Sequence, residues 1–126
     1  MKHYVSILIA LLFFGCSTND DSAEETARTT DPIIGSWYLT IDGNGSPMIY
    51  NFNENGSGET IDGGTFPMRW ENQNDNFDST SQSYIIEDEG RISFDVVFSN
   101  DFNSFRYNWT EINDPVNTWT GDGTRN

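Results

Sequence analysis

The chain has 126 residues, with 20 acidic side chains against six lysines and arginines, and its formal net charge is −14 at neutral pH. This charge opposes binding to nucleic acids and to anionic lipid headgroups, because both are themselves negative. Lys2, His3 and Cys16 are the only lysine, histidine and cysteine. Beyond Cys16 the chain therefore lacks the histidine or lysine base that usually activates a Ser or Thr nucleophile, and the usual ligands of zinc, copper or haem. We expect a non-catalytic protein without a metal or cofactor.

The first 15 residues have the features of a secretory signal peptide. Positive charge at Lys2 and His3 precedes an apolar run, residues 4–14, that is shorter than the roughly 20 residues of a membrane-spanning helix. Residues 13–16, Phe-Phe-Gly-Cys, resemble the lipobox of bacterial lipoproteins, in which a small residue precedes the acylated cysteine. The resemblance implies that this segment is removed and that Cys16 is anchored to a membrane of the cell envelope. The alternative, a cysteine buried at the end of a core helix, requires a 3.6-residue polar periodicity that the run lacks.

Residues 16–30 contain no large apolar side chain and several acids. Such a composition cannot offset the entropy lost on ordering, so we expect a flexible acidic tether. Its start is similar to the Ser- and Asp-rich export signals that follow the lipidated cysteine in lipoproteins of the Bacteroidota. That resemblance implies an outer-membrane protein displayed at the cell surface, and a plain solvated spacer is the alternative.

From Asp31 onward apolar residues recur with a period of two, which is typical of strands with one dry and one wet face. Turn signals rich in Asn-Gly and Asp-Gly separate these segments. Many short antiparallel strands in sequence order predict an all-β fold, a small antiparallel meander that closes into a β-barrel and so protects its edges. Pro67 predicts an edge or a bulge in the third segment. The inward sets are Trp37, Leu39 and Ile41; Met48, Tyr50 and Phe52; Phe66, Met68 and Trp70; Ile92, Phe94, Val96 and Phe98; and Phe105, Tyr107 and Trp109.

The segment from residue 31 to 126 resembles the lipocalin-like domains of small bacterial lipoproteins. The resemblance rests on four motifs in order: residues 32–37 (Pro-Ile-Ile-Gly-Ser-Trp), 52–58 (Phe-Asn-Glu-Asn-Gly-Ser-Gly), 66–70 (Phe-Pro-Met-Arg-Trp) and 98–101 (Phe-Ser-Asn-Asp). It implies a single lipocalin-like β-barrel domain that serves as a binding module.

The same resemblance implies a structural plug at one end of the barrel. Gly35 allows a tight turn into the first strand, and Trp37 is the plug residue. In lipocalins an arginine from the end of the chain covers this tryptophan. Arg125 matches that position here, and Arg106 is the alternative.

The barrel interior is the candidate ligand site. An eight-stranded barrel is only just wide enough for its own side chains, and the inward residues here are large, so a packed core competes with a cavity for a small apolar ligand. The candidate ligand-binding residues are Tyr50, Phe66, Met68, Trp70, Phe94, Phe98, Phe105 and Tyr107, with Val96 beside them.

Three other interpretations compete with ligand binding. Asp42, Asn44 and Ser46 are spaced like the first ligands of a calcium loop, but Pro47 replaces the required glycine and Asn53 the closing glutamate, so a hairpin turn is preferred and no metal site is predicted. The strong negative charge suits a structural or protein-interaction domain that binds cationic partners. A pair of carboxylates could also form a glycoside hydrolase site, which is the most remote alternative.

Overall fold

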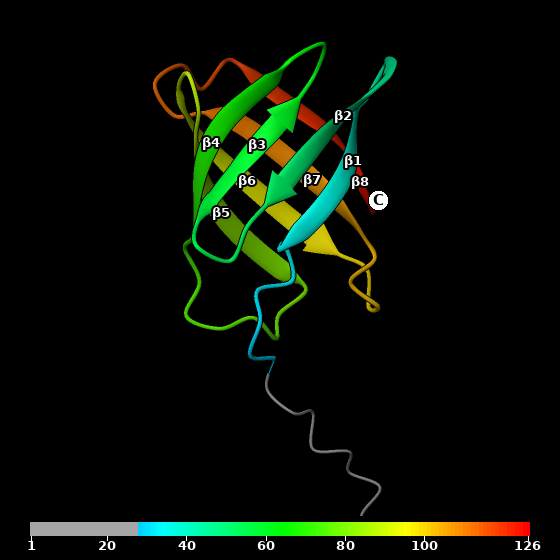
Figure 1. The fold of residues 1–126 in the computed structure, drawn as a ribbon, viewed down its shortest axis with the longest axis vertical. Helices are drawn as coiled ribbons and strands as arrows, with labels where there is room; N and C mark the ends of the chain where they lie inside the picture. The colour runs from blue at the N-terminus through cyan, green and yellow to red at the C-terminus, as the bar shows by residue number, and fades with distance from the viewer. Residues whose placement is uncertain (1–27) are drawn as a thin grey trace, which may run out of the picture.

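The computed structural model describes residues 28–126, and all regular secondary structure in this range is β-strand (Figure 1). The predicted signal peptide, Cys16 and most of the tether lie outside the described residues. Within the range 28–126 no helix has the length and apolarity to cross a membrane. The strands are β1 (Gly35–Ile41), β2 (Asn44–Phe52), β3 (Ser57–Ile61), β4 (Thr65–Asn72), β5 (Ser81–Glu87), β6 (Arg91–Phe98), β7 (Ser104–Glu111) and β8 (Thr118–Arg125).

The predicted fold class, an all-β antiparallel meander that closes into a barrel, is confirmed. Each strand pairs with its neighbours in sequence, and β1 pairs with β8 in an unbroken register from Trp37 opposite Arg125 to Ile41 opposite Gly121. Eight strands in up-and-down order are also the number and order of a lipocalin barrel. Closure gives every one of the eight strands two neighbours, which removes the free edges of an open sheet.

The two ends of the barrel differ. The N-terminal segment enters at the end that we call the plug end (Figure 1), together with the connections 53–56, 73–80 and 99–103. The opposite end, which we call the mouth end, consists of the connections 42–43, 62–64, 88–90 and 112–117. Gly43 and Gly63 have positive φ angles of 81° and 66°, which explains why Asp-Gly is found at both of these turns.

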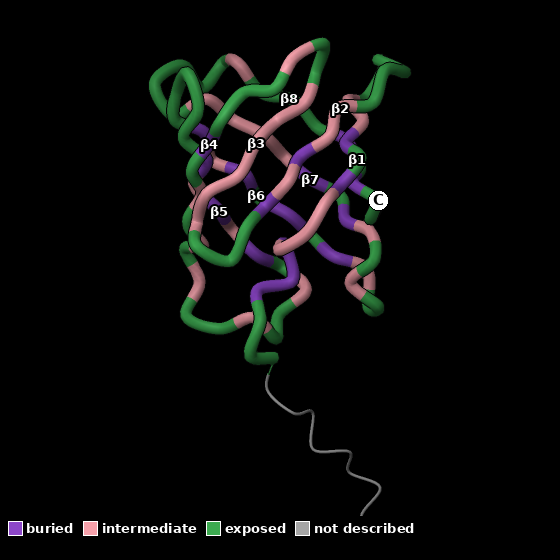
Figure 2. The backbone as a smooth tube through the Cα atoms, in the orientation of Figure 1, coloured by how far each residue is buried: buried purple, intermediate pink, exposed green. Residues whose placement is uncertain are grey.

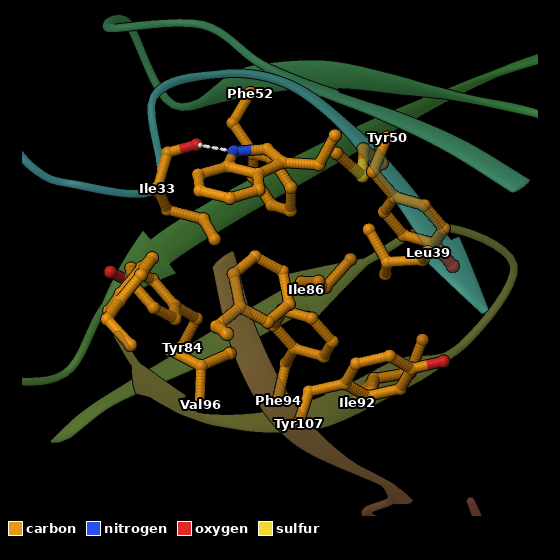
Figure 3. Close-up of a cluster of buried hydrophobic side chains, with 14 residues drawn as sticks. Ile33, Leu39, Tyr50, Phe52, Tyr84, Ile86, Ile92, Phe94, Val96 and Tyr107 are labelled. Atoms are coloured by element: carbon orange, nitrogen blue, oxygen red, sulfur yellow. Dashed lines mark hydrogen bonds between the residues drawn. The ribbon is translucent and has the colours of Figure 1, made fainter. Parts of the chain in front are cut away.

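Buried residues recur along the strands and in the segment that enters the barrel (Figure 2), and the buried apolar side chains form one core cluster. The predicted inward sets supply most of it, and Phe66 differs because it is 47% exposed near the mouth end. Ile33 from the entering segment and Tyr84 and Ile86 from β5 complete the core (Figure 3). The buried apolar residues are Ile33, Trp37, Leu39, Tyr50, Phe52, Met68, Tyr84, Ile86, Ile92, Phe94, Val96, Phe98, Phe105 and Tyr107.

Glycines on the inward face make room for the largest side chains. A Cβ atom at Gly123 would clash with the Phe105 ring, and one at Gly121 would clash with the backbone of Thr40 and the Tyr107 ring. These glycines lie directly opposite those aromatic residues, since Phe105 pairs with Gly123 and Tyr107 with Gly121. The pairing of a glycine with an aromatic residue lets the large ring occupy space that a Cβ atom would fill.

Pro67 lies within β4 without a bulge. Its partner in β3 is Glu59, and the register there is continuous from Ser57 to Ile61. The backbone N–H of Trp70 donates to the carbonyl of Gly56, on the β3 side of β4. Because successive residues of a strand direct their N–H groups to opposite sides, the nitrogen of residue 67 faces β5. The pairing of β4 with β5 begins only at Arg69. Pro67 therefore occupies a local edge, where its missing N–H leaves no ladder bond unmade.

Candidate functional site

The plug end is closed by the chain segment that precedes β1. The carbonyl of Ile33 accepts a hydrogen bond of 2.6 Å from the Trp37 indole N–H, marked by the dashed line in Figure 3. The guanidinium of Arg125 lies over the same indole, 4.3 Å from the ring centre. It also donates to the backbone carbonyls of Pro32 (2.8 Å), Ile34 (2.9 Å) and Phe102 (3.3 Å). Arg125 thereby joins the last strand, the entering segment and the tryptophan.

Gly35 provides the space for this arginine. Its φ angle of 127° is disfavoured for other residues, and a Cβ atom there would lie 2.7 Å from Nη1 of Arg125. Burial, together with the nearby charge of Arg28, holds the pKa of Arg125 below its usual value, yet an arginine stays charged in proteins. Arg106, the alternative in the sequence, instead forms exposed ion pairs with Asp42 and Asp122.

A buried carboxylate also fastens the entering segment to the barrel. Asp31 is 5% exposed, and its Oδ1 accepts hydrogen bonds from the Tyr84 hydroxyl (2.7 Å) and the Ile33 backbone N–H (3.0 Å). Its Oδ2 accepts one from the Asn72 amide at 2.7 Å. The Asn72 amide also donates to the side-chain oxygen of Gln82. The Gln82 side-chain amide in turn donates to the carbonyls of Asn76 and Ser79, which extends the network into the 73–80 connection. The plug end is thus closed by apolar packing and by a satisfied polar network.

The mouth end contains an apolar pocket of about 170 Å³. Two tryptophans form its rim, with the rings of Trp109 and Trp119 4.3 Å apart at 49°. Trp119 is 42% exposed, so one aromatic face stands at the entrance. The lining residues are Leu39, Ile41, Met48, Tyr50, Tyr107, Trp109 and Trp119. This is the place in the described chain where the barrel interior opens to solvent through an apolar, aromatic entrance.

The two tyrosines of the pocket have different hydrogen bonding. Both lie on the opposite side of the core from Ile33 (Figure 3). The Tyr107 hydroxyl donates to the carbonyl of Thr40 at 3.0 Å. Tyr50 is 8% exposed as a residue; no hydrogen bond joins its hydroxyl to another of residues 28–126, and the oxygen is open to solvent, since no fully buried side-chain nitrogen or oxygen in this range lacks a partner. Burial, helped by the negative charge of Asp42, raises the pKa of Tyr107 to about 12, and burial also raises the pKa of Tyr50.

The predicted ligand-binding residues fall into three groups. Tyr50 and Tyr107 line the mouth pocket. Met68, Phe94, Val96, Phe98 and Phe105 lie inside the packed core, where Phe94 contacts both Phe105 and Tyr107. Phe66 is exposed, and Trp70 lies toward the plug end, where its indole N–H donates to the carbonyls of Asn53 and Ser57. The structure therefore brings two of the candidates together at an opening.

Trp119 was not singled out from the sequence. It shares the inward face of β8 with Gly121, Gly123 and Arg125, and those glycines and the arginine hide the apolar alternation. The sequence signal that could indicate an inward Trp119 is its alternation with Gly121 and Gly123, since the residues between them, Thr120 and Asp122, are polar. The other lining residues, Leu39, Ile41, Met48 and Trp109, were assigned inward faces without being named as ligand contacts.

The turn once compared with a calcium loop is a two-residue hairpin. Asp42 and Gly43 connect β1 to β2, and Asp42 binds Arg106 and Thr120. The hydrogen bond from Arg106, and to a smaller extent that from Thr120, lowers the pKa of Asp42. Within residues 28–126 no three His, Cys, Asp or Glu side chains are grouped as metal ligands.

Comparisons with known proteins leave the site to be interpreted from its own geometry. No protein-family model matches the chain, and neither the curated proteins nor the solved structures contain a match.

Proposed function

We propose that this protein is a lipoprotein, anchored through Cys16 and displayed on the outer membrane at the cell surface, whose barrel is a non-catalytic binding module for a small apolar ligand. The observation that carries the binding role is the apolar pocket of about 170 Å³ at the mouth end. The remainder of the interior is packed with large side chains, so the ligand enters at the mouth and contacts the rim tryptophans.

The anchor is supported by the sequence before the barrel. A positively charged start, an apolar run and Gly15-Cys16 precede an acidic spacer. The described chain enters the barrel at the plug end, opposite the mouth pocket (Figure 1). Expression of the full chain in a lipoprotein-processing bacterium with radiolabelled palmitate tests the anchor. We expect label in the unmodified chain and none in Cys16→Ser, and equal labelling of both would refute it.

The pocket volume limits what can bind. Dry cavities of about 150 Å³ lined by apolar side chains accept benzene, whereas drug-sized ligands occupy pockets of roughly 300 Å³ or more. A volume of about 170 Å³ therefore suits one aromatic ring or a short branched alkyl group. Such a small ligand buries little surface, so we expect a dissociation constant on the order of 0.1–1 mM for a bare aromatic compound.

Ligand-detected NMR with 2-phenylethanol tests the binding role. We expect saturable transfer from the protein to the ring protons, and a loss of affinity in Trp119→Ala, which removes one side of the entrance. The matched control is Val116→Ala, because Val116 is 87% exposed in the neighbouring connection and does not line the pocket. Absence of saturable transfer, or an equal effect of both substitutions, would argue against the pocket as a binding site.

A second candidate is a structural or protein-interaction domain. It is favoured by the packed interior and by the excess of acidic side chains, which suits cationic partners. This candidate predicts that lysozyme or another basic protein binds the full chain in low salt and is released as salt rises. Binding of such a protein with no uptake of 2-phenylethanol would favour it over the pocket.

A further inference from the structure

The four connections at the mouth end contain acids and no basic residue. None of the segments 42–43, 62–64, 88–90 and 112–117 has a lysine, arginine or histidine. Asp42 is already paired with Arg106. The carboxylates of Asp62 and Asp88 form no ion pair within residues 28–126, and both side chains are exposed. Arg91, which follows the connection 88–90, is paired with Glu87. The mouth end therefore retains the unpaired carboxylates of Asp62 and Asp88, and such an excess of negative charge favours a cation over an anion.

Asp62 stands close to the pocket because of the strand register. Tyr50 pairs with Thr60 across β2 and β3, and Asp62 begins the turn two residues further toward the mouth. Asp88 and Asp62 are also two of the charges that raise the pKa of Tyr50, after the larger effect of burial. The two carboxylates therefore act on Tyr50, which lines the pocket.

Tyr50 offers a ligand a polar atom inside the apolar pocket. The residue is 8% exposed and lines the pocket, and no hydrogen bond joins its hydroxyl to another of residues 28–126. No side-chain nitrogen or oxygen that is buried in this range lacks a partner, so the Tyr50 oxygen is open to the pocket and can be reached by a ligand. A ligand ammonium group could donate to this oxygen, and the faces of Trp109 and Trp119 would attract the same positive charge.

We propose that the mouth pocket binds a small organic cation, with one aromatic ring or short alkyl body among the rim tryptophans and an ammonium group near Tyr50, Asp62 and Asp88. The proposal deepens the binding role given above and rests on it. The pocket supplies the size limit, Tyr50 supplies a hydrogen-bond acceptor, and the turns supply the charge that selects a cation.

Three ligands with the same ring and different charge test the proposal: 2-phenylethylammonium, 2-phenylethanol and 3-phenylpropionate. The full acylated chain is placed in phosphatidylcholine nanodiscs, and empty discs are measured in parallel to subtract binding to lipid. In low salt we expect the cation to bind about tenfold more tightly than the alcohol, and the carboxylate to bind most weakly. The preference should shrink as salt is raised, because the carboxylates are exposed.

Two double variants with the same net charge test whether the preference for the cation arises from the carboxylates at the mouth end. Asp62→Asn with Asp88→Asn should reduce the preference for the cation to about threefold or less and leave the alcohol unchanged, since amides keep the size and remove the charge. Glu54→Gln with Asp75→Asn makes the same change in net charge in the plug-end connections, and should keep the full preference. Thermal melts of both variants verify that the barrel is folded.

The outcomes separate this proposal from the binding role itself. Equal affinity for the cation and the alcohol would overturn the charge selection while leaving the pocket as a binding site. An equal effect of the two double variants would also overturn it, because net charge alone would then explain the preference. Failure of all three ligands to bind would instead refute the binding role.

Discussion

Arg125 and Trp37 are opposite one another in the β1–β8 seam and also touch through their side chains, with the guanidinium 4.3 Å from the indole centre. The last strand and the first are therefore joined by backbone pairing and by a cation–π contact at the same point. Because Arg125 also binds the carbonyls of Pro32 and Ile34, the contact holds the entering segment across the plug end.

Arg125→Ala should lower the free energy of unfolding by about 2 kcal/mol, from a cation–π contact of roughly 0.5–2 kcal/mol and the loss of hydrogen bonds to carbonyl groups. For a domain of this size that corresponds to a fall in melting temperature of about 10 °C. Thermal denaturation followed by circular dichroism measures it. Arg106→Ala is the control, because its ion pairs are exposed and do not contact Trp37, and should have a much smaller effect. An equal loss in the two variants would contradict the assignment of Arg125 as the plug cover.

Gly123→Ala should destabilise the barrel by about 1–3 kcal/mol, because the added methyl group overlaps the Phe105 ring in a packed interior. Urea denaturation is the measurement. Gly45→Ala should leave stability nearly unchanged, since no atom lies within 4 Å of the added carbon. Combining Gly123→Ala with Phe105→Leu should cost less than the sum of the two single changes, because the smaller side chain relieves the clash. Strict additivity would show that the clash is not the cause.

Tyr84→Phe should lower stability by about 1–3 kcal/mol, because it removes one donor from the buried Asp31 carboxylate. Tyr38→Phe, on the exposed face of β1, is the matched control and should change stability by less than about 0.5 kcal/mol. Chemical denaturation of both variants gives the comparison. If the loss arises from Asp31, the double variant with Asp31→Asn should lose less than the two single variants together.

Stability should fall as the pH rises above about 10. Burial raises the pKa of Tyr50 and Tyr84 above that of a free tyrosine, and that of Tyr107 to about 12. The unfolded chain then releases protons that the folded chain retains, so stability is complete below pH 10 and declines until the folded tyrosines themselves ionise. Urea midpoints between pH 8 and 11 measure the decline. Tyr50→Phe should reduce its slope without losing a protein hydrogen bond, and an unchanged slope would exclude Tyr50 as a contributor.

The sequence alone determined the fold class and the inward face of five strands, since a period of two and Asp-Gly or Asn-Gly turns act locally along the chain. It was less informative for β3, β5 and β8. Gly58, Gly121 and Gly123 interrupt the apolar pattern, because their role is to make room for a large neighbour on another strand. That reason appears only when the strands are paired.

Only the tertiary structure decided which arginine covers Trp37, because Arg106 lies on the outward face of β7, whereas the register places Arg125 directly opposite Trp37. It also decided where the interior is open. Phe94 and Tyr107 have the same alternation in the sequence, yet Phe94 is enclosed by other rings and Tyr107 borders the mouth pocket. The alternation of residues along a strand specifies which face of the sheet a side chain occupies. The height of that side chain along the barrel axis, and the empty volume beside it, depend on contacts between residues that are distant in sequence.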